Sequence, residues 1–430
     1  MSFFAPPENK DNNHQINDKH LSSNILHQRK LTASLIQDVD ETKIVSYATK
    51  LVLVSVFLIS AGLLVLYSAS FGIAGLKYFQ NQLVWAVISI SGAILAYFIG
   101  YKKLTELSPY ILIVVFILLC GAFFGPEING ANRWIRIPLP GMALSLQPSE
   151  LTKIALSLFL AGYCAANYRN FPKLFSKYGM IVPGLITAII LAAIAAGKDM
   201  GTTILVAAMS GVILFIAGMR LRYLLIGGAL ALLLCVIVVL NNPTRMKRIT
   251  DFTNPEKTAE TSGYQLFMSQ LALGSGGLTG QGFMCSRMKA KYLPEAHTDF
   301  ILSIVGEEFG FLGIMVILGA YATFCYLAFK ISFNARNKLG MFLGCGLSSF
   351  IAMQALINMS VIGGLAPTKG MPAPFISYGG TNLVSCVVAV GILLSIASDA
   401  INEDYNSKFY NILSAITGIF KRKNGKKSLQ

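Results

Sequence analysis

The sequence predicts an all-α polytopic membrane protein with ten transmembrane helices and a large extracytoplasmic loop between spans 7 and 8. Of its 430 residues, 54% are hydrophobic and only 13% are charged, whereas soluble domains average about 25% charged residues. The apolar runs are long and continuous, without the alternation that is typical of membrane strands. Composition therefore favours a helical membrane protein over a soluble domain or a barrel.

Ten apolar stretches are long enough to serve as membrane-spanning helices, which need roughly 20 residues each. The expected spans are 49–69, 82–100, 108–125, 149–167, 179–196, 200–219, 222–240, 299–329, 340–363 and 376–399. Three extracytoplasmic loops carry unusual residue patterns, and they cover 126–148, 241–298 and 364–375. Together the spans make up one transmembrane domain over 49–400, with both termini on the same side of the membrane.

The positive charges indicate which side that is. The net charge is +15, and most short-loop cations lie on the side of the termini. These are Lys102, Lys103, Arg169, Lys173, Lys177, Arg220, Arg222, Lys330, Arg336 and Lys338. The opposite short loops hold only Lys77, Arg133, Arg136, Lys198 and Lys369. Because cytoplasmic loops are enriched in Lys and Arg, both termini are predicted to be cytoplasmic.

The two ends of the chain read as tails. Residues 1–48 are polar, which predicts a mostly disordered cytoplasmic tail and gives no sign of a cleavable signal peptide. Residues 401–430 form a basic cytoplasmic tail that suits an anionic membrane surface rather than nucleic acid. The chain has seven cysteines, but no CxxC motif, so neither a disulfide framework nor a zinc site is indicated.

One passage, 291–310, brings ionisable residues to a membrane boundary. A polar segment with Glu295, His297 and Asp299 runs into an apolar stretch that carries Glu307 and Glu308. A charge at bilayer depth costs roughly 2.5–3.5 kcal/mol, so these acids must face protein or a wet cavity. On a helix, Asp299 and Glu307 would share a face about 12 Å apart and could border one cavity. Asp299 could be a helix N-cap, a catalytic acid or base, or both.

The loop 126–148 and the helix after it hold a second group of candidates. Trp134 lies between Arg133 and Arg136. The tryptophan could be an interfacial anchor, and the arginines could contact lipid headgroups. Glu150 and Lys153 are three residues apart on the next helix, where they can form an ion pair. That pair could be structural or functional.

Two further loops contain many glycines or prolines. The glycines of 274–282 lack the spacing of a phosphate-binding loop, so close backbone approach or loop mobility is favoured over nucleotide binding. Prolines and glycines in 365–382 exclude a regular helix and predict a re-entrant or cavity-lining turn that carries Lys369. Asp199, at the start of the sixth span, is favoured as a helix N-cap.

The candidate residues limit the chemistry. The outer side offers an acid near the membrane edge and scattered cations, but no metal-ligand cluster, nucleotide fold or Ser-His-Asp signature. One reaction that needs only these groups is an in-line displacement of a sugar from a lipid pyrophosphate. Cations stabilise the leaving diphosphate, and a carboxylate accepts the proton of the attacking hydroxyl. Desolvation would raise the pKa of that carboxylate, and nearby cations would oppose the rise.

Several motifs resemble the SEDS family (shape, elongation, division, sporulation) in the family's order, from about residue 45 to 400. They are Tyr292-Leu-Pro-Glu-Ala-His-Thr-Asp299-Phe-Ile with Gly306-Glu-Glu308, Ala131-Asn-Arg-Trp-Ile135, Gln147-Pro-Ser-Glu-Leu-Thr-Lys153, Gly263-Tyr-Gln265, and Pro367-Thr-Lys-Gly370 with Pro374-Phe-Ile-Ser-Tyr-Gly-Gly380. The polar N-terminal tail and two of the motifs resemble the division branch more than the elongation branch. Gly197-Lys198-Asp199 departs from the family, in which proline commonly precedes the Asp.

The resemblance implies a ten-span peptidoglycan glycosyltransferase that polymerises lipid II at the division septum of the bacterial inner membrane. It also implies work with a class B penicillin-binding protein, which supplies the transpeptidase, and with other divisome proteins. Asp299 matches the family's essential catalytic acid, and Glu150 and Lys153 match residues that line a central cavity. The expected substrate-binding set is Arg133, Trp134, Arg136, Glu150, Lys153, His297, Lys369 and Ser377.

The resulting hypothesis makes Asp299 the general base for the acceptor sugar's 4-hydroxyl. Cations among Arg133, Arg136, Lys153 and Lys369 would hold pyrophosphates, and Glu150 would fix Lys153. No cofactor is assigned, although Mg²⁺ or Mn²⁺ could accompany the pyrophosphate. Two alternatives stay open: a lipid II flippase, since polar groups and broken helices also suit transporters, and a non-catalytic scaffold that recruits the transpeptidase.

Overall fold

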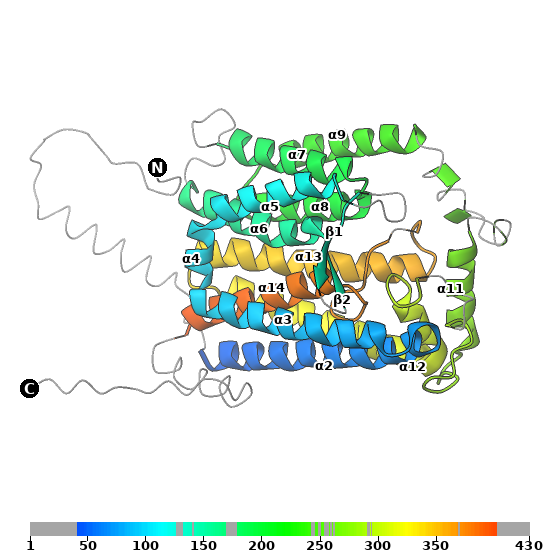
Figure 1. Ribbon diagram of the computed structural model, residues 1–430. Coiled ribbons are helices and arrows are strands. Elements are labelled where there is room, and N and C mark those ends of the chain that lie inside the picture. The colour runs from blue at the N-terminus through cyan, green and yellow to red at the C-terminus, as the bar shows by residue number, and fades with distance from the viewer. Residues whose placement is uncertain are drawn as a thin grey trace, which may run out of the picture.

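The protein is a bundle of long helices that run in roughly one direction (Figure 1). The computed structural model describes residues 41–125, 132–139, 142–168, 179–241, 246–247, 251–252, 258, 260, 263–289, 293, 295–368 and 370–401. The long helices are α2 (Glu41–Ala74), α3 (Lys77–Ile99), α5 (Ser108–Ala122), α6 (Pro148–Ala166), α7 (Ile181–Ala196), α8 (Met200–Ile216), α9 (Leu221–Leu240), α12 (Ile301–Phe333), α13 (Lys338–Ile362) and α14 (Gly380–Asp399). Each expected span coincides with one of them.

Length and composition place nine of these helices in two groups, and α6 belongs to neither. Five helices in the described part of the chain are long and apolar enough to cross a membrane: Glu41–Phe71, Lys77–Ile99, Ile301–Phe333, Lys338–Ile362 and Gly380–Asp399. Four shorter apolar helices are Ser108–Ala122, Ile181–Ala196, Met200–Ile216 and Leu221–Ala231. An arrangement of many apolar helices is therefore present, and the count of ten spans stays a prediction.

The first helix begins earlier than the sequence predicted. Residues 41–48 were assigned to a disordered tail, but α2 starts at Glu41. Ile44, Ala48 and Leu51 recur at helical spacing and are buried against the bundle. Their burial extends the helix beyond the apolar run, because an apolar stripe needs a partner surface even where the flanking residues are polar. The earlier part of the predicted tail and residues 402–430 lie outside the described residues.

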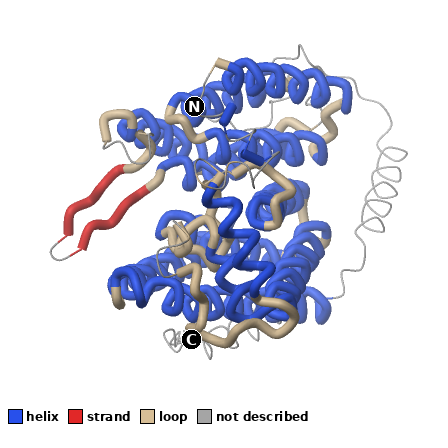
Figure 2. Tube along the Cα trace, turned by 90° about the vertical axis from the view of Figure 1, so that its right-hand side faces the viewer, coloured by secondary structure: helices blue, strands red, loops and turns tan. Residues whose placement is uncertain are grey.

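Two predicted loops contain regular structure. Within 126–148, β1 (Ile135–Leu139) and β2 (Met142–Leu146) pair as an antiparallel hairpin, with Ile135 opposite Leu146. The hairpin projects from the helical body (Figure 2). Pro140 and Gly141 separate its two apolar runs, which is a turn signal that the sequence did contain. Within 241–298, α11 (Tyr264–Ser275) lies at the opposite end of the bundle from the short α4 (Tyr101–Glu106) (Figure 1).

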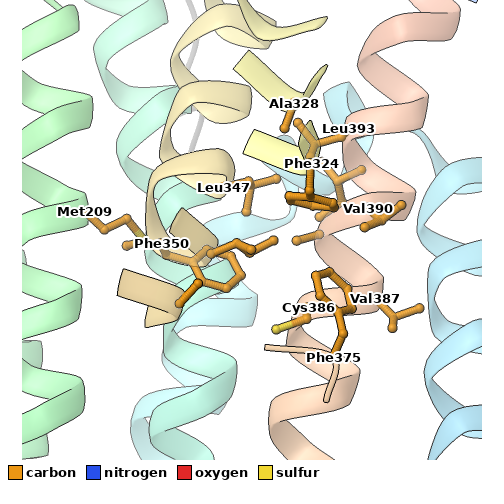
Figure 3. Close-up of a cluster of buried hydrophobic side chains, with 14 of the residues drawn as sticks. Met209, Phe324, Ala328, Leu347, Phe350, Phe375, Cys386, Val387, Val390 and Leu393 are labelled. Carbon is orange, nitrogen blue, oxygen red and sulfur yellow. The ribbon is translucent and has the colours of Figure 1, made fainter. Parts of the chain in front are cut away.

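The hydrophobic core runs through most of the bundle, and part of it lies where α12, α13 and α14 meet. Figure 3 shows Phe324, Phe350 and Phe375 there with smaller apolar side chains between them. The Phe324 and Phe375 rings lie 5.3 Å apart. Phe375 belongs to the non-helical turn after α13, so the core anchors that turn as well as the helices. The site described below is built on this turn.

Helix α12 is broken near its start. Gly310 has φ 68° and ψ −165°, outside the helical region. The loop at 277–282 inserts there: Phe311 N donates to Gly277 O at 2.9 Å, and Gln281 N donates to Glu307 O at 3.0 Å. A Cβ on Gly280 would collide with the Glu308 carbonyl. Close backbone approach, one of the two roles expected of these glycines, is therefore confirmed.

Candidate functional site

Asp299 lies in the turn that leads into α12 and is half-buried. The helix starts at Ile301 with Phe300 as its N-cap and no side-chain capping bond, so the interpretation of Asp299 as the cap is wrong. Instead, its backbone oxygen accepts a hydrogen bond from Asn358 Nδ2 at 2.9 Å. Its carboxylate lies against Gly370, where an added Cβ would be 2.9 Å from Oδ2. The absence of a side chain at 370 leaves room for the acid.

The turn between α13 and α14 is held by side chains of the surrounding helices. Four side chains donate hydrogen bonds to carbonyl oxygens of this turn. The donor and acceptor residues are Asn358 and Met371 (2.7 Å), Gln354 and Pro372 (2.7 Å), Tyr321 and Pro374 (2.5 Å), and Gln82 and Ser377 (3.3 Å). Non-helical backbone at membrane depth requires such cover. Ser377 is buried, and its hydroxyl accepts from Ala373 N at 2.8 Å. As placed here, Ser377 shapes the turn.

Glu150 and Lys153 form the expected ion pair, with Lys153 Nζ 2.6 Å from Glu150 Oε2. The pair lies deeper than the sequence suggested, since Lys153 is 0% exposed. Its ammonium also donates to Gln354 Oε1 at 2.7 Å and lies 5.4 Å from the Phe350 ring centroid. Direct contact between Lys153 and a diphosphate would therefore require this pair to open.

Asp199 links the start of α8, the start of α6 and Arg133. As predicted, it caps α8, and its side chain accepts from Thr202 N at 3.3 Å. It also accepts hydrogen bonds from Gln147 Nε2 and Ser149 Oγ, both at 2.8 Å, at the start of α6. Arg133 Nη1 approaches its other oxygen at 3.5 Å. Asp199 thus connects Arg133 to the helix that carries Glu150, a role that the sequence did not reveal.

Arg133 and Arg136, two of the remaining predicted cations, differ in their surroundings. Arg133 keeps 24% of its side chain exposed, and Trp134 beside it is half-buried. Arg136 is exposed on β1, where it pairs with Ser145. Lys369 lies outside the described residues. Among the residues described, the structure thus places Arg133 close to the start of α6 and Arg136 on the projecting hairpin.

His297 is held by aromatic rings two residues before Asp299. Its ring stacks on Tyr78 at 4.5 Å and lies 5.7 Å from Tyr378, and its backbone oxygen accepts from Tyr378 N at 3.0 Å. Burial lowers the pKa of His297, and Glu295 nearby opposes that shift. The imidazole is therefore neutral at neutral pH. It fixes one side of the turn that carries Asp299.

Glu307 and Glu308 bind the preceding loop. Glu307 accepts from the Ser286 hydroxyl and from Arg287 N at 2.8 Å. Glu308 forms a buried pair with Lys289 at 2.9 Å and accepts from Ser68 Oγ of α2 at 2.5 Å. The two acids therefore face protein, one of the two surroundings expected of them.

The sequence-based interpretation missed Gln354 and Asn358, although both contact the candidate site. They are 1% and 2% exposed. Their signal in the sequence is that two carboxamides stand four residues apart in a mainly apolar helix, which places them on one face. Without the fold, nothing indicates that this face meets both Asp299 and Lys153.

Fold and site together define a multi-pass helical membrane protein with a broken helix, a buried ion pair and a half-buried carboxylate at the end of the bundle. The chain matches the family model FtsW/RodA/SpoVE, described as "Cell cycle protein", over residues 48–402. This protein belongs to that family.

Individual relatives agree with the family assignment. The "Probable peptidoglycan glycosyltransferase FtsW" of Trichlorobacter lovleyi is 38% identical, covering 83% of this chain and 94% of the relative. Stage V sporulation protein E of Bacillus subtilis is 34% identical, covering 83% and 98%. Among solved structures, a peptidoglycan synthase complex has a TM-score of 0.68 at 25% identity, covering 82% of this chain and 98% of that one. Thermus thermophilus RodA has a TM-score of 0.61 at 24% identity, covering 82% and 97%.

Proposed function

We propose that this protein is a peptidoglycan glycosyltransferase that polymerises lipid II at the division septum. Relatives named for this activity are 34–38% identical over most of the chain. The observation that carries the proposal is the position of Asp299 at the end of the bundle. Its carboxylate is half-buried and packs against Gly370, and its backbone oxygen accepts a hydrogen bond from Asn358. A carboxylate in such a position suits proton transfer from an incoming hydroxyl.

In the proposed reaction, Asp299 accepts the proton of the acceptor sugar's 4-hydroxyl. The hydroxyl oxygen then forms a bond to the anomeric carbon of the donor, and the bond from that carbon to the pyrophosphate oxygen breaks. Undecaprenyl pyrophosphate leaves as an anion, and the anomeric centre is inverted. We assign Arg133, Arg136 and Lys369 to the diphosphate. The buried pair of Glu150 and Lys153 supports the site from within.

A divalent cation could accompany the diphosphate as part of the substrate. Within the described residues, no group of three or more His, Cys, Asp or Glu side chains lies together. We derive no catalytic step from Mg²⁺ or Mn²⁺.

The proposed partner is a class B penicillin-binding protein in the bacterial inner membrane, alongside other divisome proteins. Support comes from the similarity to a solved peptidoglycan synthase complex, which is described as coordinating polymerization and crosslinking. Both termini are proposed to be cytoplasmic on the basis of the Lys and Arg distribution. The outer end would then carry Asp299, where lipid II and the transpeptidase are accessible.

The test is polymerisation of purified lipid II by the full-length protein with its cognate transpeptidase. Asp299→Asn should lower the rate by roughly 100-fold or more, the usual contribution of a general base. Glu295→Gln is the matched control, because Glu295 is an acid of the same turn whose side chain accepts from Thr298 at 2.7 Å. Undiminished glycan strands from folded Asp299→Asn would refute the catalytic role.

A lipid II flippase is the second candidate, favoured by the break in α12 at Gly310 and by the non-helical turn after α13. The two functions differ in product, because a flippase moves lipid II without forming glycosidic bonds. Translocation without polymer by the wild-type protein would establish the flippase. A scaffold would show neither activity, and Asp299→Asn would then be harmless in cells.

A further inference from the structure

Two carboxamides of α13 connect the candidate base to the buried ion pair. Gln354 and Asn358 are four residues apart, so they lie on one face of the helix, about 6 Å apart along its axis. Asn358 reaches Asp299, and Gln354 reaches Lys153. Phe350, one turn earlier on the same face, lies against the Lys153 ammonium. A single helix face therefore meets both halves of the site.

The hydrogen bonds of each amide explain why these residue types stand there. A carboxamide nitrogen has two donor hydrogens. Asn358 Nδ2 donates to Asp299 O at 2.9 Å and to Met371 O at 2.7 Å. Gln354 Nε2 donates to Pro372 O at 2.7 Å and to Asn382 Oδ1 at 2.8 Å. Each NH₂ group thus joins α13 to two further positions in the chain.

The three consecutive residues Gly370, Met371 and Pro372 each contact either Asp299 or one of the two amides. Gly370 abuts the Asp299 carboxylate, while the carbonyls of Met371 and Pro372 are held by the two amides. Displacement of either amide would therefore move the backbone next to Gly370, against which the Asp299 carboxylate packs. The side-chain oxygen of Gln354 also accepts a hydrogen bond from Lys153, whose charge is already balanced by Glu150.

We propose that Gln354 and Asn358 are positioning residues that hold Asp299 in register with the Glu150–Lys153 pair through the carbonyls of Met371 and Pro372. This inference rests on the proposed function, because it assigns the residues to the orientation of the base. The buried pair serves as the fixed point, and α13 transmits its position to the turn. Neither amide contacts the reacting atoms.

Two substitutions remove the donors while keeping the shape. Asn358→Leu deletes both N–H donors. Gln354→Glu keeps an oxygen for Lys153 but loses the bonds to Pro372 and Asn382. Ser349→Ala is the matched control, because it removes a buried hydroxyl from the same helix. Among the described residues, that hydroxyl donates to the Gly346 carbonyl one turn away, at 2.8 Å. All three are compared as the full-length protein with its cognate transpeptidase.

The kinetic readout separates positioning from simple stabilisation. Asn358→Leu should lower kcat roughly tenfold to a hundredfold, with a much smaller change in KM, because misplacing a catalytic group by about 1 Å can cost that much. It should also move the acid limb of the pH–rate profile, which reports the base. Gln354→Glu should lower kcat less, and Ser349→Ala should match wild type. Wild-type kcat and an unmoved acid limb in folded Asn358→Leu would overturn the inference.

Hydrogen exchange tests the same link without any activity. Asn358→Leu should increase amide exchange in both 295–301 and 370–379, whereas Ser349→Ala should change neither. If the wild-type protein fails to polymerise lipid II, the proposed function fails, but the exchange result still decides whether the amides hold the turn. If Asn358→Leu does not fold, Gln354→Glu decides in its place. Unchanged exchange in the folded donor-deficient variant would refute the positioning role.

Discussion

Replacing Lys153 by Met should destabilise the protein far more than replacing both members of the buried pair. Lys153 Nζ is 2.6 Å from Glu150 Oε2, and the two side chains are 1% and 4% exposed. Removing only the cation leaves Glu150 buried with Ser385 Oγ at 3.3 Å. Breaking a buried pair in this way typically costs about 3–5 kcal/mol. That is a large part of a total stability of roughly 5–15 kcal/mol.

The double variant Glu150→Leu, Lys153→Met should behave differently. Replacing a buried ion pair by apolar groups is often neutral or stabilising by about 1–4 kcal/mol. Here Gln354 Oε1 also loses its donor, which costs about 1–3 kcal/mol. These terms roughly cancel, so the double variant should unfold close to wild type. The coupling energy of the pair is then about 3 kcal/mol or more, as a double-mutant cycle would measure it.

Thermal unfolding in detergent provides the assay, because buried thiols react with a dye only once the bundle opens. Cys164, Cys345 and Cys386 are buried, and the exposed Cys285 and the half-buried Cys120 and Cys325 can be replaced by Ser beforehand. At about 2 °C per kcal/mol, Lys153→Met should lower the midpoint by roughly 6–10 °C. The reasoning is refuted if the single and double variants are destabilised equally, or if Lys153→Met is neutral.

Three further predictions concern the surroundings of the site. Burial holds the folded-state pKa of His297 below its ordinary value of 6.5, so its contribution to stability is full above pH 6.5 and falls as pH drops toward the folded value. His297→Phe should remove this loss of stability in thermal melts between about pH 7.5 and 5. An identical loss in the variant would contradict the attribution of the pH dependence to His297. Gly310→Ala would place a Cβ at φ 68° and 2.6 Å from Leu278 backbone atoms, so the melting midpoint should fall by several degrees, and an unchanged midpoint would refute the packing. Tyr321→Phe removes the donor to the buried Pro374 carbonyl and should cost about 1–3 kcal/mol, as denaturant or thermal unfolding would show; no loss would mean that another donor replaces the phenol.

The helices were predictable because a continuous apolar run of membrane-spanning length can be recognised in the sequence. The breaks were predictable only in part. Glycines and prolines marked the turn after α13, but the partners of its carbonyls come from residues as distant as Gln82 and Tyr321. The glycines of 274–282 indicated close backbone approach, but they did not indicate that this loop inserts into a helix at Gly310. Local composition reveals where a helix must stop, and only tertiary structure reveals what satisfies the exposed backbone.

The candidate site shows the same limit. Glu150 and Lys153 were paired correctly because three residues along a helix bring side chains together. Asp199 was identified as a cap, which depends on its own backbone, but its contacts with Arg133 and Gln147 depend on the fold. Gln354 and Asn358 were missed because a polar residue in an apolar helix has no distinctive pattern until its neighbours are known.

The break at Gly310 couples the loop 277–282 to the segment of α12 that follows Asp299. Because this loop exchanges backbone hydrogen bonds with α12 at the break, the short segment Ile301–Phe309 is bonded to the loop as well as continuous with the rest of α12. A sideways force on that loop would tilt this segment, with Asp299 next to its first residue, while the later part of α12 stays embedded in the core. If Asp299 is the base, as proposed, a protein bound to this loop would act on the reaction without having to touch the substrate.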